Sequence, residues 1–157
     1  MVSRIRRAMA FVISVAMLAV PLGGQASAGG GPVNLRADLS GANEVPGPGD
    51  PDGWGKANIW VNAAAGAVCF KLAWYGIEGP VAAHIHRGRA GVAGPVRVLL
   101  FESSTPLPST IHAVGGCVEA AHDLLMRIVD QPNKFYVNVH NVPYPAGAIR
   151  GQLHRAY

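Results

Sequence analysis

Short runs of alternating apolar and polar residues follow one another along most of the chain. The clearest run spans residues 67–75, where Val68, Phe70, Leu72 and Trp74 alternate with polar or small residues. This alternation is typical of a strand with one face on a core. Glycine, proline and aspartate separate the runs, as expected for turns. The pattern predicts strands at 33–39, 56–63, 67–75, 81–87, 95–101, 113–118, 134–140 and 147–154.

One segment, residues 120–130, has helical periodicity instead. Leu124, Leu125, Ile128 and Val129 fall on one stripe of a helix, and Pro132 follows as a stop signal. Short strands at regular spacing with one helix predict an all-β protein. We expect an antiparallel Greek-key β-sandwich or flattened barrel with one short helix packed on it.

The first 28 residues have the organisation of a secretory signal peptide. Arg4, Arg6 and Arg7 precede an apolar run at 8–20, and Ala26-Ser27-Ala28 has the small residues of a cleavage site. We therefore expect a secreted, periplasmic or cell-envelope protein, with Sec and twin-arginine export both open. The expected organisation is a signal peptide at 1–28, a flexible entry segment at 29–33 and one domain at 34–157.

Charge and length set limits on the partners of the expected mature chain. Three of the 13 basic residues lie in the signal peptide, which leaves ten against nine acids. The sequence has no basic stripe with interleaved aromatic residues, so a nucleic-acid partner is not expected. No segment after the signal peptide has the length and hydrophobicity of a membrane span. We expect a monomer.

The two cysteines, Cys69 and Cys117, are predicted to form a disulfide. A chain bound for an oxidising compartment forms a bridge by default, and no C-x-x-C spacing indicates a redox or metal role. Two buried free thiols are the alternative.

Three histidines form the candidate metal site. His84 and His86 are two residues apart on one predicted strand, opposite in phase to Val81, Ala83 and Ile85. On a later strand His140 shares its face with Asn138. If the apolar residues mark the core, all three histidines lie on the outside of the sheet. Neutral imidazoles bind copper and zinc, and we expect a surface copper site if the two strands are neighbours.

A structural role for the same histidines is the alternative, with hydrogen bonds to loop carbonyls, Asn138 or Glu44. His112, His122 and His154 are weaker candidates, although His154 is in phase with Arg150. Calcium at Asp50 and Asp52 is conceivable, but two carboxylates in a Gly/Pro-rich segment are more typical of a turn.

Four spaced motifs together resemble the CHRD module, the family named for its occurrence in chordin and found alone in secreted bacterial proteins. The match runs over about residues 34–153. It implies an extracellular module and leaves its chemistry open. One departure is Ala148, where the family often has an acid. The motifs are LSGANEVP at 39–46, GDPDG at 49–53, AHIHRG at 83–88 followed by Gly94-Pro95, and FYVNVHN at 135–141 followed by PAGAIRGQL at 145–153.

A looser similarity links the chain to copper-zinc superoxide dismutase, another Greek-key barrel. The order His84, His86, His140, Arg150 resembles that enzyme's copper ligands and the arginine beyond them. Between His86 and His140, however, no residues match its zinc ligands.

We therefore expect an extracellular binding or structural module, with copper at the three histidines and Asn138, Arg150 and Glu44 around them. No arrangement of catalytic nucleophiles is evident. One alternative is a copper-dependent redox enzyme. Another is a metal-free module that recognises an extracellular protein or cell-surface ligand through an exposed aromatic patch. The aromatic candidates are Trp54, Tyr144 and Tyr157.

Overall fold

The computed structural model of the chain describes residues 31–156. The predicted signal peptide, its cleavage site and Tyr157 lie outside the described residues. In the described part, the strands agree with the predicted ones to within two residues, except that the last predicted strand is divided in two. The strands are β1 (Val33–Ser40), β2 (Trp54–Asn62), β3 (Ala67–Tyr75), β4 (Pro80–Arg87), β5 (Val96–Glu102), β6 (Ala113–Glu119), β7 (Phe135–Asn141), β8 (Ile149–Gln152) and β9 (His154–Arg155).

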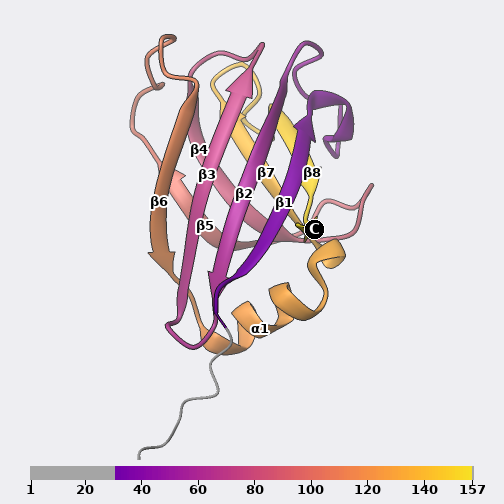
Figure 1. Cartoon of the computed structure of the whole chain (residues 1–157). Coiled ribbons are helices and arrows are strands. Elements are labelled where there is room, and N and C mark those ends of the chain that lie inside the picture. Colours follow the sequence, from indigo (N-terminus) through magenta and orange to yellow (C-terminus); the bar gives the residue numbers. More distant parts are fainter. Residues whose placement is uncertain (1–30, 157) are drawn as a thin grey trace, which may run out of the picture.

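All strand pairs are antiparallel, and the strand order is β5-β4-β7-β8-β1-β2-β3-β6, with β9 paired to β1. Figure 1 shows β6, β3, β2 and β1 as one layer, with β5, β4, β7 and β8 behind it. The edge strands β5 and β6 approach each other but are not paired in the described chain. The fold is therefore a nearly closed, flattened antiparallel barrel, which confirms the predicted fold class.

The core lies between the two layers, and alternation decides which residues enter it. On β3, Val68, Phe70, Leu72 and Trp74 are all at most 5% exposed, as their spacing predicts. From the other layer Ile85, Val137, Val139 and Ile149 face them and are fully buried. Each such aliphatic side chain contributes about 1.5–3 kcal/mol when it leaves water.

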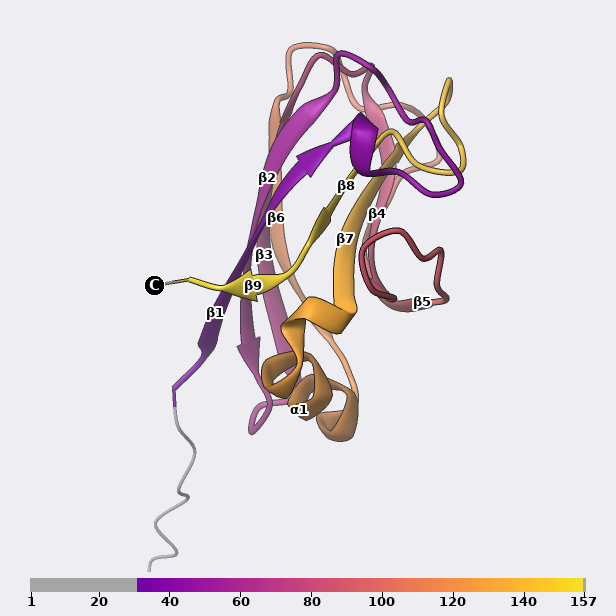
Figure 2. The same ribbon diagram turned by 90° about the vertical axis from the view of Figure 1, so that its right-hand side faces the viewer.

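Helix α1 (His122–Asp130) lies across one end of the barrel (Figure 2). Leu125 and Ile128 are fully buried against the core, while Leu124 and Val129 are half-buried. The helix begins two residues later than predicted because Ala121 has extended backbone dihedrals. Two short 3-10 helices, η1 (Gly41–Asn43) and η2 (Pro132–Lys134), were not predicted.

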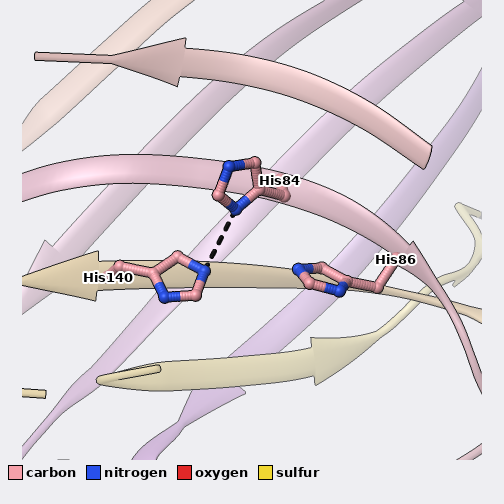
Figure 3. A group of neighbouring side chains, drawn as sticks. All are labelled: His84, His86 and His140. Carbon is pink, nitrogen blue, oxygen red and sulfur yellow. Dashed lines mark hydrogen bonds between the residues drawn. The ribbon is translucent and has the colours of Figure 1, made fainter. Parts of the chain in front are cut away.

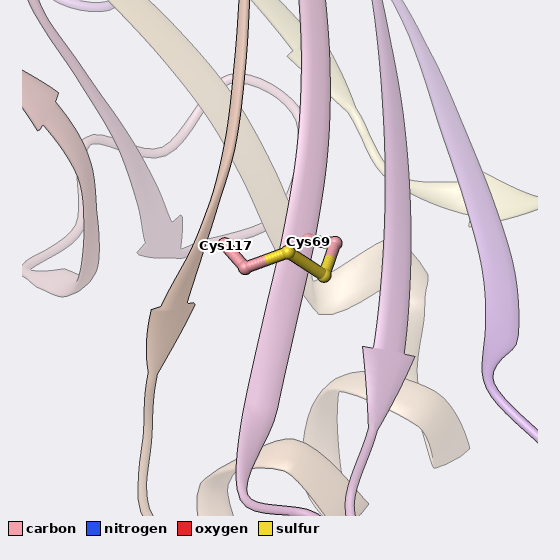
Figure 4. Close-up of a disulfide and its surroundings, with 2 residues drawn as sticks. All are labelled: Cys69 and Cys117. Carbon is pink, nitrogen blue, oxygen red and sulfur yellow. A yellow bond between two sulfur atoms is a disulfide. The ribbon is translucent and has the colours of Figure 1, made fainter.

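The predicted disulfide is confirmed: Cys69 on β3 and Cys117 on β6 are directly opposite each other and bonded (Figure 4). Their side chains alternate with core residues and therefore lie on the outer face of the front layer. The bridge joins the edge strand β6 to β3, in which every second residue from Val68 to Trp74 is buried in the core.

Strand β7 is buried on both faces, and this arrangement positions the candidate site. Its inner residues face the core, whereas Tyr136 and Asn138 on the outer face are only 2–3% exposed. Two loops cover that outer face. Glu44, just after η1, contacts Asn138, and Gly94, between β4 and β5, contacts Tyr136. The outer side of the back layer is thus a polar layer enclosed by loops.

Candidate metal centre

The three histidines of the candidate site meet because β4 and β7 are neighbours. In the register of this pair, Ala82 lies opposite His140, His84 opposite Asn138 and His86 opposite Tyr136. One ring nitrogen from each of His84, His86 and His140 lies within 4.8 Å of the other two. Figure 3 shows the three rings around one small space, two from β4 and one from β7. This separation is short enough for one metal ion to contact all three.

Backbone carbonyls fix which nitrogen of two rings is free. His86 Nδ1 lies 2.9 Å from the Gly94 carbonyl oxygen, and His140 Nδ1 lies 3.0 Å from the Pro145 carbonyl oxygen. A carbonyl only accepts, so each Nδ1 must carry the proton and donate it. In the neutral ring this leaves the Nε2 lone pair free, which is how protein metal sites usually orient a histidine ligand.

The Nε2 atoms of these two rings have different surroundings. His86 Nε2 is buried and has no hydrogen-bond partner among the described residues. His140 Nε2 lies 3.1 Å from His84 Nδ1. Because His140 Nε2 accepts, His84 Nδ1 carries the shared proton when no metal is bound. If His84 changes tautomer, so that its proton sits on Nε2 and the ring stays neutral, Nδ1 of His84 and Nε2 of His86 and His140 could together hold a metal ion.

The histidine pKa values favour the neutral rings that bind metals. Burial above all, together with the proximity of His140 and His86, lowers the pKa of His84 to about 4. Burial also lowers the pKa of His86 and of His140, although their hydrogen bonds to the carbonyls of Gly94 and Pro145 act to raise it. At neutral pH the site therefore presents uncharged imidazoles, which need not lose a proton to solvent before binding a metal.

The site is less exposed than the sequence predicts. The histidines do lie on the outer face of their strands, opposite the core residues. His86, however, is only 8% exposed, and His84 and His140 are half-buried. The expectation of a surface site was wrong in this respect because strand alternation cannot show that loops cover the outer face.

Arg150 and Tyr136 hold the loop that orients His86. The Arg150 guanidinium donates from Nη2 to the carbonyls of Arg89 and Val92, both at 2.9 Å. Its carbon Cζ lies 3.4 Å from the centroid of the Tyr136 ring, a cation–π contact. The Tyr136 hydroxyl accepts from the Gly94 amide at 3.1 Å. These contacts fix the loop whose Gly94 carbonyl binds His86.

Gln152, on β8, donates a hydrogen bond to the start of the same loop, which joins β4 and β5. Its amide nitrogen lies within 2.9 Å of the carbonyl oxygens of Gly88, Asn133 and Phe135. The sequence analysis missed both Gln152 and Tyr136 as site residues. Their phase was the available signal, since Tyr136 shares a strand face with Asn138 and His140, and Gln152 shares one with Arg150.

A buried acid lies beside this polar layer. Glu44 is 6% exposed, and its Oε2 accepts a hydrogen bond from Asn138 Nδ2 at 3.1 Å. Burial raises the pKa of Glu44 to about 7, although the Arg150 charge, the Val45 amide and Asn138 oppose the rise. Gly147, at φ +147°, packs on the carboxyl, where a Cβ would collide with its oxygens. The structure therefore brings Glu44, Asn138 and Arg150 together next to the histidines.

The remaining candidate residues lie elsewhere. His154 is exposed on β9, opposite Arg36, and the structure does not bring it to the three histidines. His122 Nδ1 is 2.9 Å from the Ala63 carbonyl oxygen. Asp50 and Asp52 form a turn, in which the Asp52 amide donates to Asp50 Oδ1. The acid that the family often has at position 148 is replaced here by a fully buried alanine.

Of the two aromatic candidates that the structure describes, Trp54 and Tyr144, only Trp54 belongs to an exposed stack of rings. Trp54 is 50% exposed and stacks on Tyr75, with ring centroids 4.5 Å apart. Tyr75 in turn stacks on His112 at 5.7 Å. Tyr144 is half-buried in the segment between β7 and β8. The exposed ring stack therefore consists of Trp54, Tyr75 and His112, two of which were not in the predicted set.

Comparison with known families identifies the chain. The model of the CHRD domain family matches residues 35–153, which is most of the chain. The protein therefore belongs to the CHRD domain family, as its four motifs indicated. Comparisons with curated proteins and with solved structures give no significant match. Family membership and the disulfide both fit an extracellular module. Among the described residues, no helix is long and apolar enough to cross a membrane.

Proposed function

We propose that this protein is an extracellular module that binds one copper ion through His84, His86 and His140. The observation that carries the proposal is the convergence of three neutral imidazoles. Two of them have their Nδ1 protons fixed by carbonyls, and His86 Nε2 is buried without a hydrogen-bond partner. A buried acceptor without a partner is costly, and a bound metal would relieve that cost.

The donor set favours copper over other metals. Imidazole suits copper and zinc, whereas calcium and magnesium need several oxygen ligands. Among divalent first-row ions at a nitrogen site, copper binds most tightly. Neutral rings also hold Cu(I) without a thiolate. Zinc is the expected weaker competitor at the same three nitrogens.

Binding rather than redox catalysis is the role that the surroundings support. In a redox enzyme for an anionic substrate, a nearby arginine would have to face that substrate. Arg150 is only 2% exposed, donates to two loop carbonyls and stacks on Tyr136. Its position supports orientation of His86, so the proposed module holds copper and does not turn over a substrate.

Calorimetric titration of the metal-stripped chain from residue 29 onward tests the proposal. We expect one copper ion per chain with sub-micromolar affinity, and loss of that binding in His86→Ala and in His140→Ala. The matched control is His122→Ala, because His122 is exposed and lies on α1. The proposal fails if the parent binds no copper, or if His122→Ala weakens binding as much as the other two.

An activity assay on the loaded protein separates binding from catalysis. The bound copper is expected to be inert toward superoxide, with a rate no higher than that of the His86→Ala variant. Catalytic cycling that disappears in this variant would instead establish the redox enzyme.

A further inference from the structure

Five basic side chains gather around the end of the barrel at which α1 lies, although they are distant in sequence. They come from the end of β4, the loop after it, β5, α1 and η2. We name the surface that they line the basic groove. Its cations are Arg87, Arg89, Arg97, Arg127 and Lys134.

The groove consists of three adjoining hollows that share Arg87. Their volumes are about 270, 460 and 70 Å³. The first shares Arg97 with the second and Arg127 with the third, and the second and third share Lys134. Because neighbouring hollows have walls in common, they form one extended surface and not three separate pockets.

The charge of the groove is not balanced by its own lining. Within residues 31–156, no aspartate or glutamate lines any of the three hollows. Asp123 and Asp130 lie about one helical turn from Arg127 on α1, but neither borders the groove. Residues 31–156 contain ten basic and nine acidic residues, so half of the basic ones are concentrated here. Such a concentration attracts an anionic partner in a nearly neutral chain.

The shape and lining favour a chain of spaced anions. Arginine binds planar oxyanions such as carboxylate, and sulfate as well, through paired hydrogen bonds. Four of the five cations are arginines, and Arg87, Arg89, Arg97 and Arg127 are exposed. Cations distributed over three shallow hollows fit a polymer with repeated charges better than one small anion.

We propose that the basic groove binds an acidic polysaccharide, through carboxylate or sulfate groups repeated along its chain. Nucleic acid fits less well, because single strands gain affinity by stacking bases on exposed rings. Phe135, the one aromatic residue of the described chain that lines the groove, is 2% exposed and cannot offer its ring. An extracellular module also meets charged polysaccharides where it is located. This inference goes beyond copper binding and does not depend on it.

Binding to immobilised polygalacturonate and dextran sulfate tests the inference, with neutral dextran as the reference polymer. We expect the chain from residue 29 onward to bind at least one acidic polymer at about 50 mM salt and to release it as salt is raised, as ion pairing with a polyanion requires. The two polymers distinguish a carboxylate from a sulfate preference.

Matched charge variants locate the binding. Arg87→Gln with Arg97→Gln removes two cations of the groove, whereas Arg36→Gln with Lys71→Gln removes two exposed cations from β1 and β3. Both pairs change the net charge equally. We expect a loss of about tenfold or more for the groove pair, which corresponds to about 1.4 kcal/mol, and a loss of less than about twofold for the control. Circular dichroism should show both pairs folded.

Three outcomes would overturn the inference. The first is the absence of binding to both acidic polymers at low salt. The second is an equal loss in the two variant pairs, which would indicate attraction by net charge alone. The third is equally tight, equally variant-sensitive binding to polyglutamate or to oligothymidylate, which would assign the groove to an acidic peptide or to nucleic acid.

Discussion

The Tyr136 ring lies between the guanidinium of Arg150 and the ring of His86. Arg150 Cζ is 3.4 Å from the Tyr136 centroid, and the centroids of Tyr136 and His86 are 4.8 Å apart with ring planes 10° from parallel. Strand β7, which carries Tyr136, runs between the strands of the other two residues. A substitution at Arg150 can therefore disturb His86, a proposed copper ligand, through the Tyr136 ring and through the loop between β4 and β5.

Arg150→Lys should weaken copper binding without removing a ligand. Lysine keeps the charge, but it has no planar group to stack on Tyr136 while donating to the carbonyls of Arg89 and Val92. The loop that supplies the Gly94 carbonyl would then loosen. Loss of such an outer contact typically lowers metal affinity by about 10–100-fold, and calorimetry measures it.

The matched control for this change is Arg36→Lys on β1, where the side chain is exposed. It should leave the copper affinity unchanged. If Arg150→Lys folds normally and binds copper as tightly as the parent, Arg150 does not position His86.

Glu44→Gln should change the pH dependence of stability. The pKa of Glu44 is raised from 4.5 to about 7 in the folded chain. The folded state thus holds the proton more tightly than the unfolded state does. The resulting stability is complete below about pH 4.5, and it is lost as the pH rises toward and through 7.

The neutral amide of Glu44→Gln cannot ionise and can still accept from Asn138. We therefore expect parent and variant to unfold at similar temperatures at pH 5. At pH 8 the variant should be more stable, by on the order of 3 kcal/mol. Thermal unfolding at both pH values measures this, with exposed Glu119→Gln as the control. A difference that is the same at pH 5 and pH 8 would contradict the assignment.

Removal of the disulfide should destabilise the chain and leave copper binding intact. Cys69 and Cys117 are 48 residues apart, and closing a loop of this length contributes roughly 4 kcal/mol on the chain-entropy model. The bridge joins β3 to β6 in the front layer, whereas the histidines lie on β4 and β7 behind it. Urea unfolding and copper titration of Cys69→Ser with Cys117→Ser should show the loss of stability with an unchanged dissociation constant. A folded variant that no longer binds copper would show that the two regions depend on each other.

Much of the fold could be predicted from the sequence because strand alternation is a local property. The alternation at 67–75 sets the core face of β3 without knowledge of any other strand. The same logic placed His84, His86 and His140 opposite the core. It could not show that β4 and β7 are neighbours, since pairing depends on the whole chain.

The loops account for what sequence reasoning missed at the site. A loop's position depends on the strands it joins and on distant contacts, such as that of Arg150 with the Arg89 carbonyl. Burial of His86 and the raised pKa of Glu44 follow from these contacts. The basic groove was missed for a similar reason, because Arg87 and Arg127 are 40 residues apart and meet only in the fold.

The position of copper in a crystal of the loaded protein tests the central claim most directly. Anomalous diffraction recorded at the copper absorption edge locates the ion independently of any assumed ligand. We expect one peak at bonding distance, about 2 Å, from Nδ1 of His84 and from Nε2 of His86 and His140. A peak at His112, His122 or His154 instead, or no peak in protein loaded with one equivalent of copper, would contradict the proposed site.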